Sequence, residues 1–180
     1  MSSISNESEL HIKIRKLIKQ YREDPGSSLV LRELGKAYHE MRQLDTAIFY
    51  LEQALIVDSQ DWEAHVILGR IYADKEAYEE TLSHYSRAFE LSRQIDLLSL
   101  VGEALFLLKR YPLAEAHLRS TIHLEGSHQR GLSHFLLGKV LCALERYDEA
   151  FEEFQAAEKF KETDETSKWL AFAKTRINKS

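Results

Sequence analysis

Hydrophobic positions recur at helical spacing along the chain, in pairs of neighbouring segments. Around Gly35, the side chains of Leu31, Leu34 and Tyr38 complete an i, i+3, i+4, i+7 stripe, which is typical of one face of an α-helix. A second stripe with the same period spans residues 44–55, after a short polar turn at 41–43. This segment therefore predicts two helices joined by a tight turn.

The same pair of segments occurs four times, and a glycine marks each copy. The marker glycines are Gly35, Gly69, Gly102 and Gly138, which are 34, 33 and 36 residues apart and are four of the seven glycines in the chain. A glycine inside a helix costs about 1 kcal/mol relative to alanine. Its recurrence at one register therefore predicts that a second helix approaches closely there. Small residues are expected on the facing helix: Ala47, Ala114 and Ala150, with Thr81 at the equivalent position.

Amphipathic segments flank the four pairs. Residues 7–23 predict a helix that ends before Pro25 and Gly26, and residues 164–178 predict another, which Asp164 can cap. Repeat stacks need such helices to cover their apolar ends. The polar face of the first segment is basic, so contact with an anionic membrane stays open beside a solvated cap.

These features resemble the tetratricopeptide repeat family, whose unit is a 34-residue helix–turn–helix. The matching residues are Leu34-Gly35 with Tyr38, then Tyr147-x-x-Ala150 in the fourth copy, and a late alanine such as Ala54. The resemblance covers residues 28–164. The family's proline after each second helix is replaced by Ser59, Arg93, Gly126 and Glu162, and the 36-residue interval implies a longer connection at 125–131.

The resemblance implies an all-α fold, a right-handed superhelix of four repeats with a helix at each end. The expected segments are an N-terminal amphipathic helix over 1–27, repeats at 28–61, 62–94, 95–128 and 131–164, and a C-terminal capping helix over 165–180.

The resemblance also implies that the first helix of each repeat lines a concave groove. Helical angles opposite the buried glycines then select the candidate partner-binding residues: Arg32, Lys36, His39, Val66, Arg70, Asp74, Ser99, Glu103, Phe106, Leu107, Leu132, Phe135 and Lys139. Among them Arg32, Lys36 and Arg70 form a basic cluster suited to carboxylates, or merely a solvated face.

An apolar stretch follows in the second half, with Phe106, Leu107, Leu132, Phe135 and Leu136. An exposed patch of this kind usually marks an interaction surface. The alternatives are burial under the C-terminal helix and self-association.

One ligand known in the family is disfavoured. Some members grip the C-terminal carboxylate of heat-shock chaperones through a clamp of Lys, Asn, Asn, Lys and Arg. Arg32 could replace the first lysine, but Lys36 and Ile67 stand where the two asparagines belong.

Composition limits the remaining classes. The net charge of −5 argues against a nucleic-acid partner. No apolar run approaches the roughly 20 residues that span a bilayer, and the polar start shows no secretory signal. A single cysteine, Cys142, favours a reducing compartment, so we expect a cytoplasmic protein.

Residues with catalytic or metal-binding chemistry show no matching pattern. His65 and His134 fall on the packing face and are interpreted as core histidines. The histidines lack the i, i+4 spacing that grips zinc, and Cys142 has no histidine near it at helical spacing. We expect no catalytic residue, metal or cofactor.

The sequence thus predicts a non-enzymatic scaffold that holds a protein or peptide of acidic and hydrophobic character in its groove. Two alternatives stay open: a self-associating assembly protein that forms homo-oligomers, and a chaperone for secreted or membrane proteins.

Overall fold

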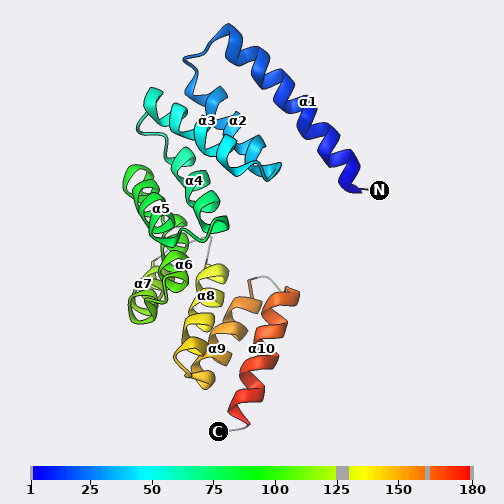
Figure 1. Cartoon of the computed structure of the whole chain (residues 1–180). Coiled ribbons are helices and arrows are strands. Elements are labelled where there is room, and N and C mark those ends of the chain that lie inside the picture. Colours follow the sequence, from blue (N-terminus) through cyan, green and yellow to red (C-terminus); the bar gives the residue numbers. More distant parts are fainter. Residues whose placement is uncertain (1, 125–129, 161–162, 179–180) are drawn as a thin grey trace. The chain divides into compact units, whose positions relative to one another are not determined.

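The computed structural model describes residues 2–124, 130–160 and 163–178, and within these ranges the chain forms ten α-helices and no strand (Figure 1). The helices are α1 (Ser2–Glu23), α2 (Ser28–Glu40), α3 (Leu44–Val57), α4 (Trp62–Asp74), α5 (Tyr78–Ser92), α6 (Leu97–Leu107), α7 (Tyr111–His123), α8 (Arg130–Ala143), α9 (Tyr147–Glu158) and α10 (Asp164–Ile177). The predicted class, an all-α helical repeat, is confirmed. Of the connection expected at 125–131, only Arg130 and Gly131 lie in the described ranges, and Gly126 and Glu162 lie outside them.

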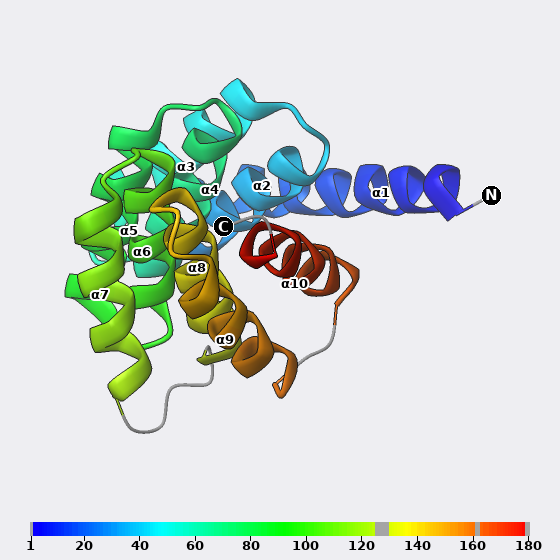
Figure 2. The same cartoon turned by 90° about the horizontal axis from the view of Figure 1, so that it is seen from below.

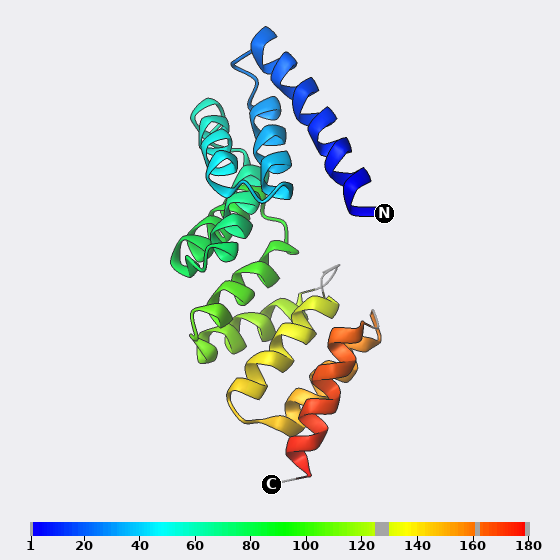
Figure 3. The same ribbon diagram turned by 45° about the vertical axis from the view of Figure 1, so that its right-hand side comes forward.

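The chain divides into two compact units, residues 1–92 and 93–180, here called the N-terminal and C-terminal units. In the N-terminal unit α1 packs on α2, and the hairpins α2/α3 and α4/α5 pack together through α3 and α4 (Figures 1 and 3). In the C-terminal unit α6/α7 and α8/α9 form hairpins, and α10 lies beside α9 (Figure 2). Each unit is therefore built from antiparallel helix pairs with short turns.

The four marker glycines lie where the two helices of a hairpin touch. A Cβ added at Gly102 would lie 2.5 Å from Leu118 Cδ2, and one at Gly138 would lie 2.5 Å from Phe154 Cε1. Leu51 and Tyr85 occupy the same place against Gly35 and Gly69.

The close approach predicted from the glycines is present, but the expected contact was wrong in one respect. The facing side chain is a large residue sixteen positions later. The small residues expected there, Ala47, Thr81, Ala114 and Ala150, are fully buried, and the Ala47 carbonyl is among the three atoms nearest to the Cβ position of its glycine, at 3.1 Å.

Each hairpin turn uses a left-handed residue seven positions after its glycine. These residues are Arg42, Glu76, Lys109 and Glu145, with φ between 57° and 61°. The N–H of the next residue returns to the helix: Gln43 donates to the Tyr38 carbonyl at 2.9 Å, and Arg146 donates to that of Leu141 at 2.9 Å. This is the bonding of a Schellman cap, in which glycine usually takes the left-handed position. The hydrogen bonds therefore hold these four residues in a left-handed conformation that non-glycine residues disfavour.

Helices α1 and α10 complete the two units. Ile14 and Leu17 of α1 are buried against Leu34 and Ala37 of α2. At α10 the predicted cap was wrong by one residue, because the Thr163 hydroxyl, and not Asp164, accepts from the Thr166 N–H at 3.1 Å. In the described part of the chain no helix is both long and apolar enough to cross a membrane.

Polar contacts join the two helices of three hairpins at one register, nineteen residues apart. His65 Nδ1 lies 2.9 Å from His84 Nδ1, His117 Nε2 donates to the Leu98 carbonyl at 2.9 Å, and His134 Nδ1 lies 2.7 Å from a Glu153 oxygen. His65 and His134 are half-buried between the helices, which agrees with their interpretation as packing residues.

Candidate functional site

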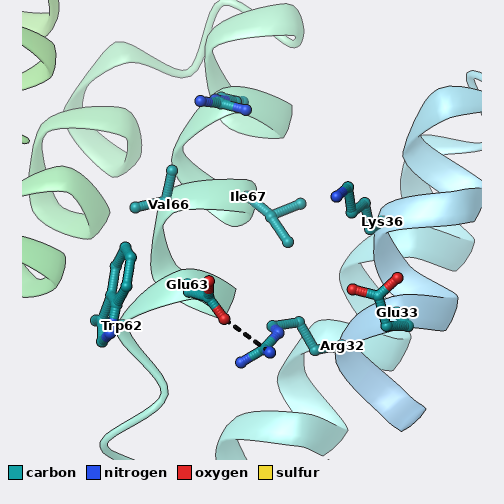
Figure 4. A pocket seen from close by; sticks show the side chains of 8 residues that line it. Arg32, Glu33, Lys36, Trp62, Glu63, Val66 and Ile67 are labelled. Carbon is teal, nitrogen blue, oxygen red and sulfur yellow. Dashed lines mark ion pairs between the residues drawn. The ribbon is translucent and has the colours of Figure 1, made fainter. Parts of the chain in front are cut away.

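A pocket of about 180 Å³ lies between α2 and α4 in the N-terminal unit (Figure 4). Its walls come from two consecutive first helices: Arg32, Glu33 and Lys36 from α2, and Trp62, Glu63, Val66, Ile67 and Arg70 from α4. Four of the residues selected from the sequence, Arg32, Lys36, Val66 and Arg70, are thus brought together around one cavity. Trp62 and Ile67 were not selected, although both supply apolar surface to it.

Arg32 differs from the sequence interpretation, because carboxylates of the protein already neutralise it. Its guanidinium donates to both carboxylate oxygens of Asp61 at 2.8 Å. It also pairs with Glu63 at 2.7 Å (Figure 4). The Asp61 side chain is only 3% exposed, and it also caps α4 by accepting from the Ala64 N–H at 3.0 Å. A buried carboxylate requires such a partner. Arg32 is therefore a structural residue that links α2 to the start of α4.

Lys36 and Arg70 are the available cations of this pocket. Both are exposed, and neither forms an ion pair with any residue that the structure describes. Glu33, the other acidic residue of the wall, pairs with Lys13 of α1 at 3.0 Å. The pocket therefore presents two uncompensated positive charges beside the apolar side chains of Trp62, Val66 and Ile67.

His39 and Asp74 lie farther along the same two helices and bind each other. His39 Nε2 lies 3.0 Å from Asp74 Oδ2, which also accepts from Arg42 at 2.6 Å. These two predicted groove residues therefore bind each other between α2 and α4, and neither lines the pocket.

Ser99 is not on the surface of the protein, although the sequence predicts that it lines the groove. It is fully buried, and its hydroxyl donates to the Asp96 carbonyl at 2.9 Å. The equivalent residues, three positions before each glycine, include Val66, which is 8% exposed, and Arg32, whose side chain is 18% exposed. Phe135 at the same position is half-buried, so this position ranges from fully buried to half-buried, and only the small side chain of Ser99 was a signal for complete burial.

In the C-terminal unit the predicted apolar stretch is only partly open. Leu136 is buried, while Phe106, Leu107, Leu132 and Phe135 are half-buried. Lys139 Nζ lies over the Phe106 ring at 5.2 Å from its centroid and over the Phe135 ring at 5.5 Å.

Trp169 of α10, which was interpreted only as part of the capping helix, completes this cluster. Its ring centroid is 5.8 Å from Lys139 Nζ.

The remaining predicted residue, Glu103 of α6, is half-buried.

Burial keeps two titratable groups of the described helices uncharged at neutral pH. Burial raises the pKa of the Cys142 thiol to about 11, so the thiol is protonated at neutral pH. Burial lowers the pKa of His84 to about 4, so its ring is neutral there. Within the described ranges no three His, Cys, Asp or Glu side chains gather as metal ligands would.

Comparisons with known proteins identify the repeat. The family model described as Tetratricopeptide repeat matches residues 32–94. Tetratricopeptide repeat protein 21B of Mus musculus is 28% identical over 157 residues, which are 84% of this chain. Because those residues are 12% of the mouse protein, the chain spans only a small part of the length of that relative.

Solved structures share the fold at lower identity. MamA is 22% identical, with a TM-score of 0.73 over 87% of this chain and 91% of its own. YrrB, a TPR protein, is 20% identical, with a TM-score of 0.69 over 90% of this chain and 84% of its own. The family model, the mouse relative and YrrB carry the same repeat, and together they support the resemblance to the tetratricopeptide repeat family, whose model residues 32–94 match.

Proposed function

We propose that the chain is a non-enzymatic scaffold that binds a peptide or partner protein on the surface of its first helices. The ligand has acidic and hydrophobic character. The family provides protein-binding surfaces, and a groove between rigid helices suits a peptide whose side chains enter separate pockets.

The observation that carries the proposal is the pair of uncompensated cations in the α2/α4 pocket. Many cations of this unit are paired, among them Arg32 with Asp61, Lys13 with Glu33, and Lys75 with Asp45. Among the described residues Lys36 and Arg70 have no such partner, and unlike the unpaired cations of α1 they flank apolar surface in a concave site. A carboxylate on a ligand would supply the missing charge, and an adjoining apolar side chain would cover Trp62 and Val66.

A structural neighbour supports a peptide ligand. YrrB is described as having an unusual peptide-binding site, and it shares the fold over most of this chain. At 20% identity the neighbour supports the kind of ligand and not its sequence.

The test is a selection from a random peptide library displayed on phage, followed by affinity measurements on the selected peptides. We expect the wild-type chain to enrich Asp or Glu next to apolar residues. The double variant Lys36→Glu/Arg70→Glu should bind these peptides at least tenfold more weakly, because two attractive contacts become repulsive.

The matched control is Arg15→Glu/Lys16→Glu, which reverses two exposed cations of α1 with the same change in net charge. It should bind the selected peptides within about twofold of the wild type. Equal losses in the two double variants would show that only overall charge matters, and selected peptides without acidic residues would refute the proposed ligand class.

The self-association alternative relied on the capping helices and on an open Phe106 and Phe135 patch. Both rings are half-buried and lie against Lys139, so this patch offers less apolar surface than the sequence suggested. Light scattering separates the two functions: the scaffold predicts one molar mass across protein concentrations, and an assembly protein predicts a mass that rises.

A further inference from the structure

Three aromatic rings from three helices of the C-terminal unit surround one ammonium group. Phe106 comes from α6, Phe135 from α8 and Trp169 from α10, and their centroids lie 5.2, 5.5 and 5.8 Å from Lys139 Nζ. All three distances fall within the roughly 6 Å over which a cation is attracted to a ring face. The three rings and Lys139 are called the aromatic–lysine cluster below.

Packing beneath the cluster holds the rings in place. Phe154 is fully buried, and its ring centroid lies 5.8 Å from that of Phe135 and 5.9 Å from that of Trp169. Phe154 also fills the space left by Gly138. The rings therefore form a surface that is set before any ligand arrives, which lowers the cost of binding.

No carboxylate of the described residues pairs with Lys139, whose ammonium lies over ring faces instead. Arg119 and Arg146 each bridge glutamates, the latter reaching Glu115 at 2.8 Å and Glu149 at 2.6 Å. Ring faces attract an ammonium but do not neutralise it as a carboxylate does. Lys139 thus places an ammonium group without a carboxylate partner at a half-buried position beside apolar surface.

The positive charge of Lys139 determines which ligand fits the aromatic–lysine cluster. A second cation would meet Lys139 at close range and be repelled. An uncharged apolar group would cover the rings but further remove the ammonium from water without a counter-charge. A carboxylate next to an apolar group satisfies both parts of the cluster.

We infer that the aromatic–lysine cluster is a second ligand-binding site, which takes an apolar side chain that adjoins a carboxylate. The inference rests on the proposed function and extends it from the α2/α4 pocket to the C-terminal unit. Trp169, which lies outside the four repeats predicted from the sequence, is a recognition residue of this site.

The two tryptophans of the chain allow the two sites to be tested separately. Trp62 lines the α2/α4 pocket and Trp169 belongs to the cluster, so their indole N–H signals in a ¹H–¹⁵N spectrum report on different sites. The Trp62→Phe variant assigns the signals. The probe is N-acetyl-phenylalanine, which joins an apolar ring to a carboxylate. N-acetyl-phenylalaninamide, which lacks the charge, and acetate, which lacks the ring, are the controls.

We expect the Trp169 signal to shift saturably with N-acetyl-phenylalanine, with an affinity about five to ten times that for the amide and no saturation by acetate. A charge-assisted hydrogen bond gives a preference of this size. Lys139→Met keeps the length of the side chain and should remove the preference for the acid, whereas Lys139→Arg should retain it. A dispersed backbone spectrum confirms that each variant is folded.

The outcomes separate this inference from the proposed function. A Trp169 response that survives Lys36→Glu/Arg70→Glu supports the second site, whatever happens at Trp62. Equal affinity for acid and amide, an unchanged preference in Lys139→Met, or a Trp169 signal that never moves overturns the inference. A Trp62 response without a Trp169 response keeps the α2/α4 pocket and eliminates the aromatic–lysine cluster.

Discussion

The two units place cations at the same repeat position but surround them differently. Lys36, Arg70 and Lys139 each follow a marker glycine by one residue. In the N-terminal unit Lys36 and Arg70 are exposed on the wall of a pocket, whereas Lys139 lies over three aromatic rings in the C-terminal unit. The repeat thus determines the position of the cation on the first helix. Side chains on the neighbouring helices determine which ligand that charge can meet.

The largest expected effect comes from filling the space beneath the aromatic–lysine cluster. In Gly138→Ala the new methyl group would overlap Phe154, which is fully buried and supports Phe135 and Trp169. We expect the free energy of unfolding to fall by about 2 kcal/mol, because overpacking outweighs the better helix propensity of alanine. Urea unfolding measures this loss. The control Gly26→Ala, whose Cβ would meet only Asp24 Oδ1 at 3.6 Å, should stay within about 0.5 kcal/mol of the wild type. An equal effect in the two variants would contradict the close approach.

A comparison of two arginines separates structural from ligand-binding cations in the N-terminal unit. Arg32→Met leaves the buried Asp61 carboxylate without its partner, so we expect a loss of about 1.5 kcal/mol in urea unfolding. Arg70→Met removes an exposed cation without an ion pair and should change stability by less than about 0.5 kcal/mol. Similar losses would mean that Arg70 also has a structural role.

The histidine pair of the α4/α5 hairpin predicts a pH dependence. Burial, followed by the charge of His65, lowers the pKa of His84 in the folded chain to about 4 from an ordinary value of 6.5. The unfolded chain therefore binds the proton first as the pH falls, and stability present above pH 6.5 is lost toward pH 4. We expect about 1 kcal/mol less unfolding free energy at pH 5 than at pH 7.5, since His84 stays partly exposed to water.

His84→Phe keeps an aromatic ring against Tyr72 and removes the titration. Its urea unfolding should depend less on pH over this interval than that of the wild type. An unchanged slope would show that other groups cause the dependence.

The smallest expected effect concerns the hairpin turns, where the two units should behave alike. Glu76 and Glu145 adopt left-handed φ values of 58° and 61°. Glycine accepts this conformation without strain, so Glu76→Gly and Glu145→Gly should each raise the unfolding free energy by about 0.5 kcal/mol. Thermal unfolding measures both, and a loss of stability in either would show that the glutamate side chain contributes more than its backbone strain costs.

The hairpins were predictable from the sequence because their determinants are local. Glycine spacing predicted the register of the helix pairs. Pro112 lies in the first turn of α7, where its missing N–H breaks no helical hydrogen bond. The Arg32–Asp61 contact could not be predicted, since it depends on the angle between consecutive first helices, which helical periodicity does not fix. The same holds for Trp169, whose ring reaches Lys139 from a different helix.

Burial of Ser99 is a different kind of failure. Helical angles place residues on a face, but they do not say how much of that face the neighbouring helices cover. The prediction missed the contact of His39 with Asp74 for the same reason. Both residues lie on the predicted face, but they bind each other between two helices.

The central claim is that ligands bind the first helices of the hairpins. The most direct measurement is the footprint of a peptide selected by the wild-type chain, mapped by backbone amide shifts in a ¹H–¹⁵N titration. We expect the largest shifts in α2 and α4, with further shifts in α6 and α8 for peptides that reach the aromatic–lysine cluster. The second helices offer a competing surface, since Phe49 and Ile56 of α3 are 55% and 75% exposed. Shifts centred on α3, with α2 and α4 unchanged where they face the pocket, would contradict the account.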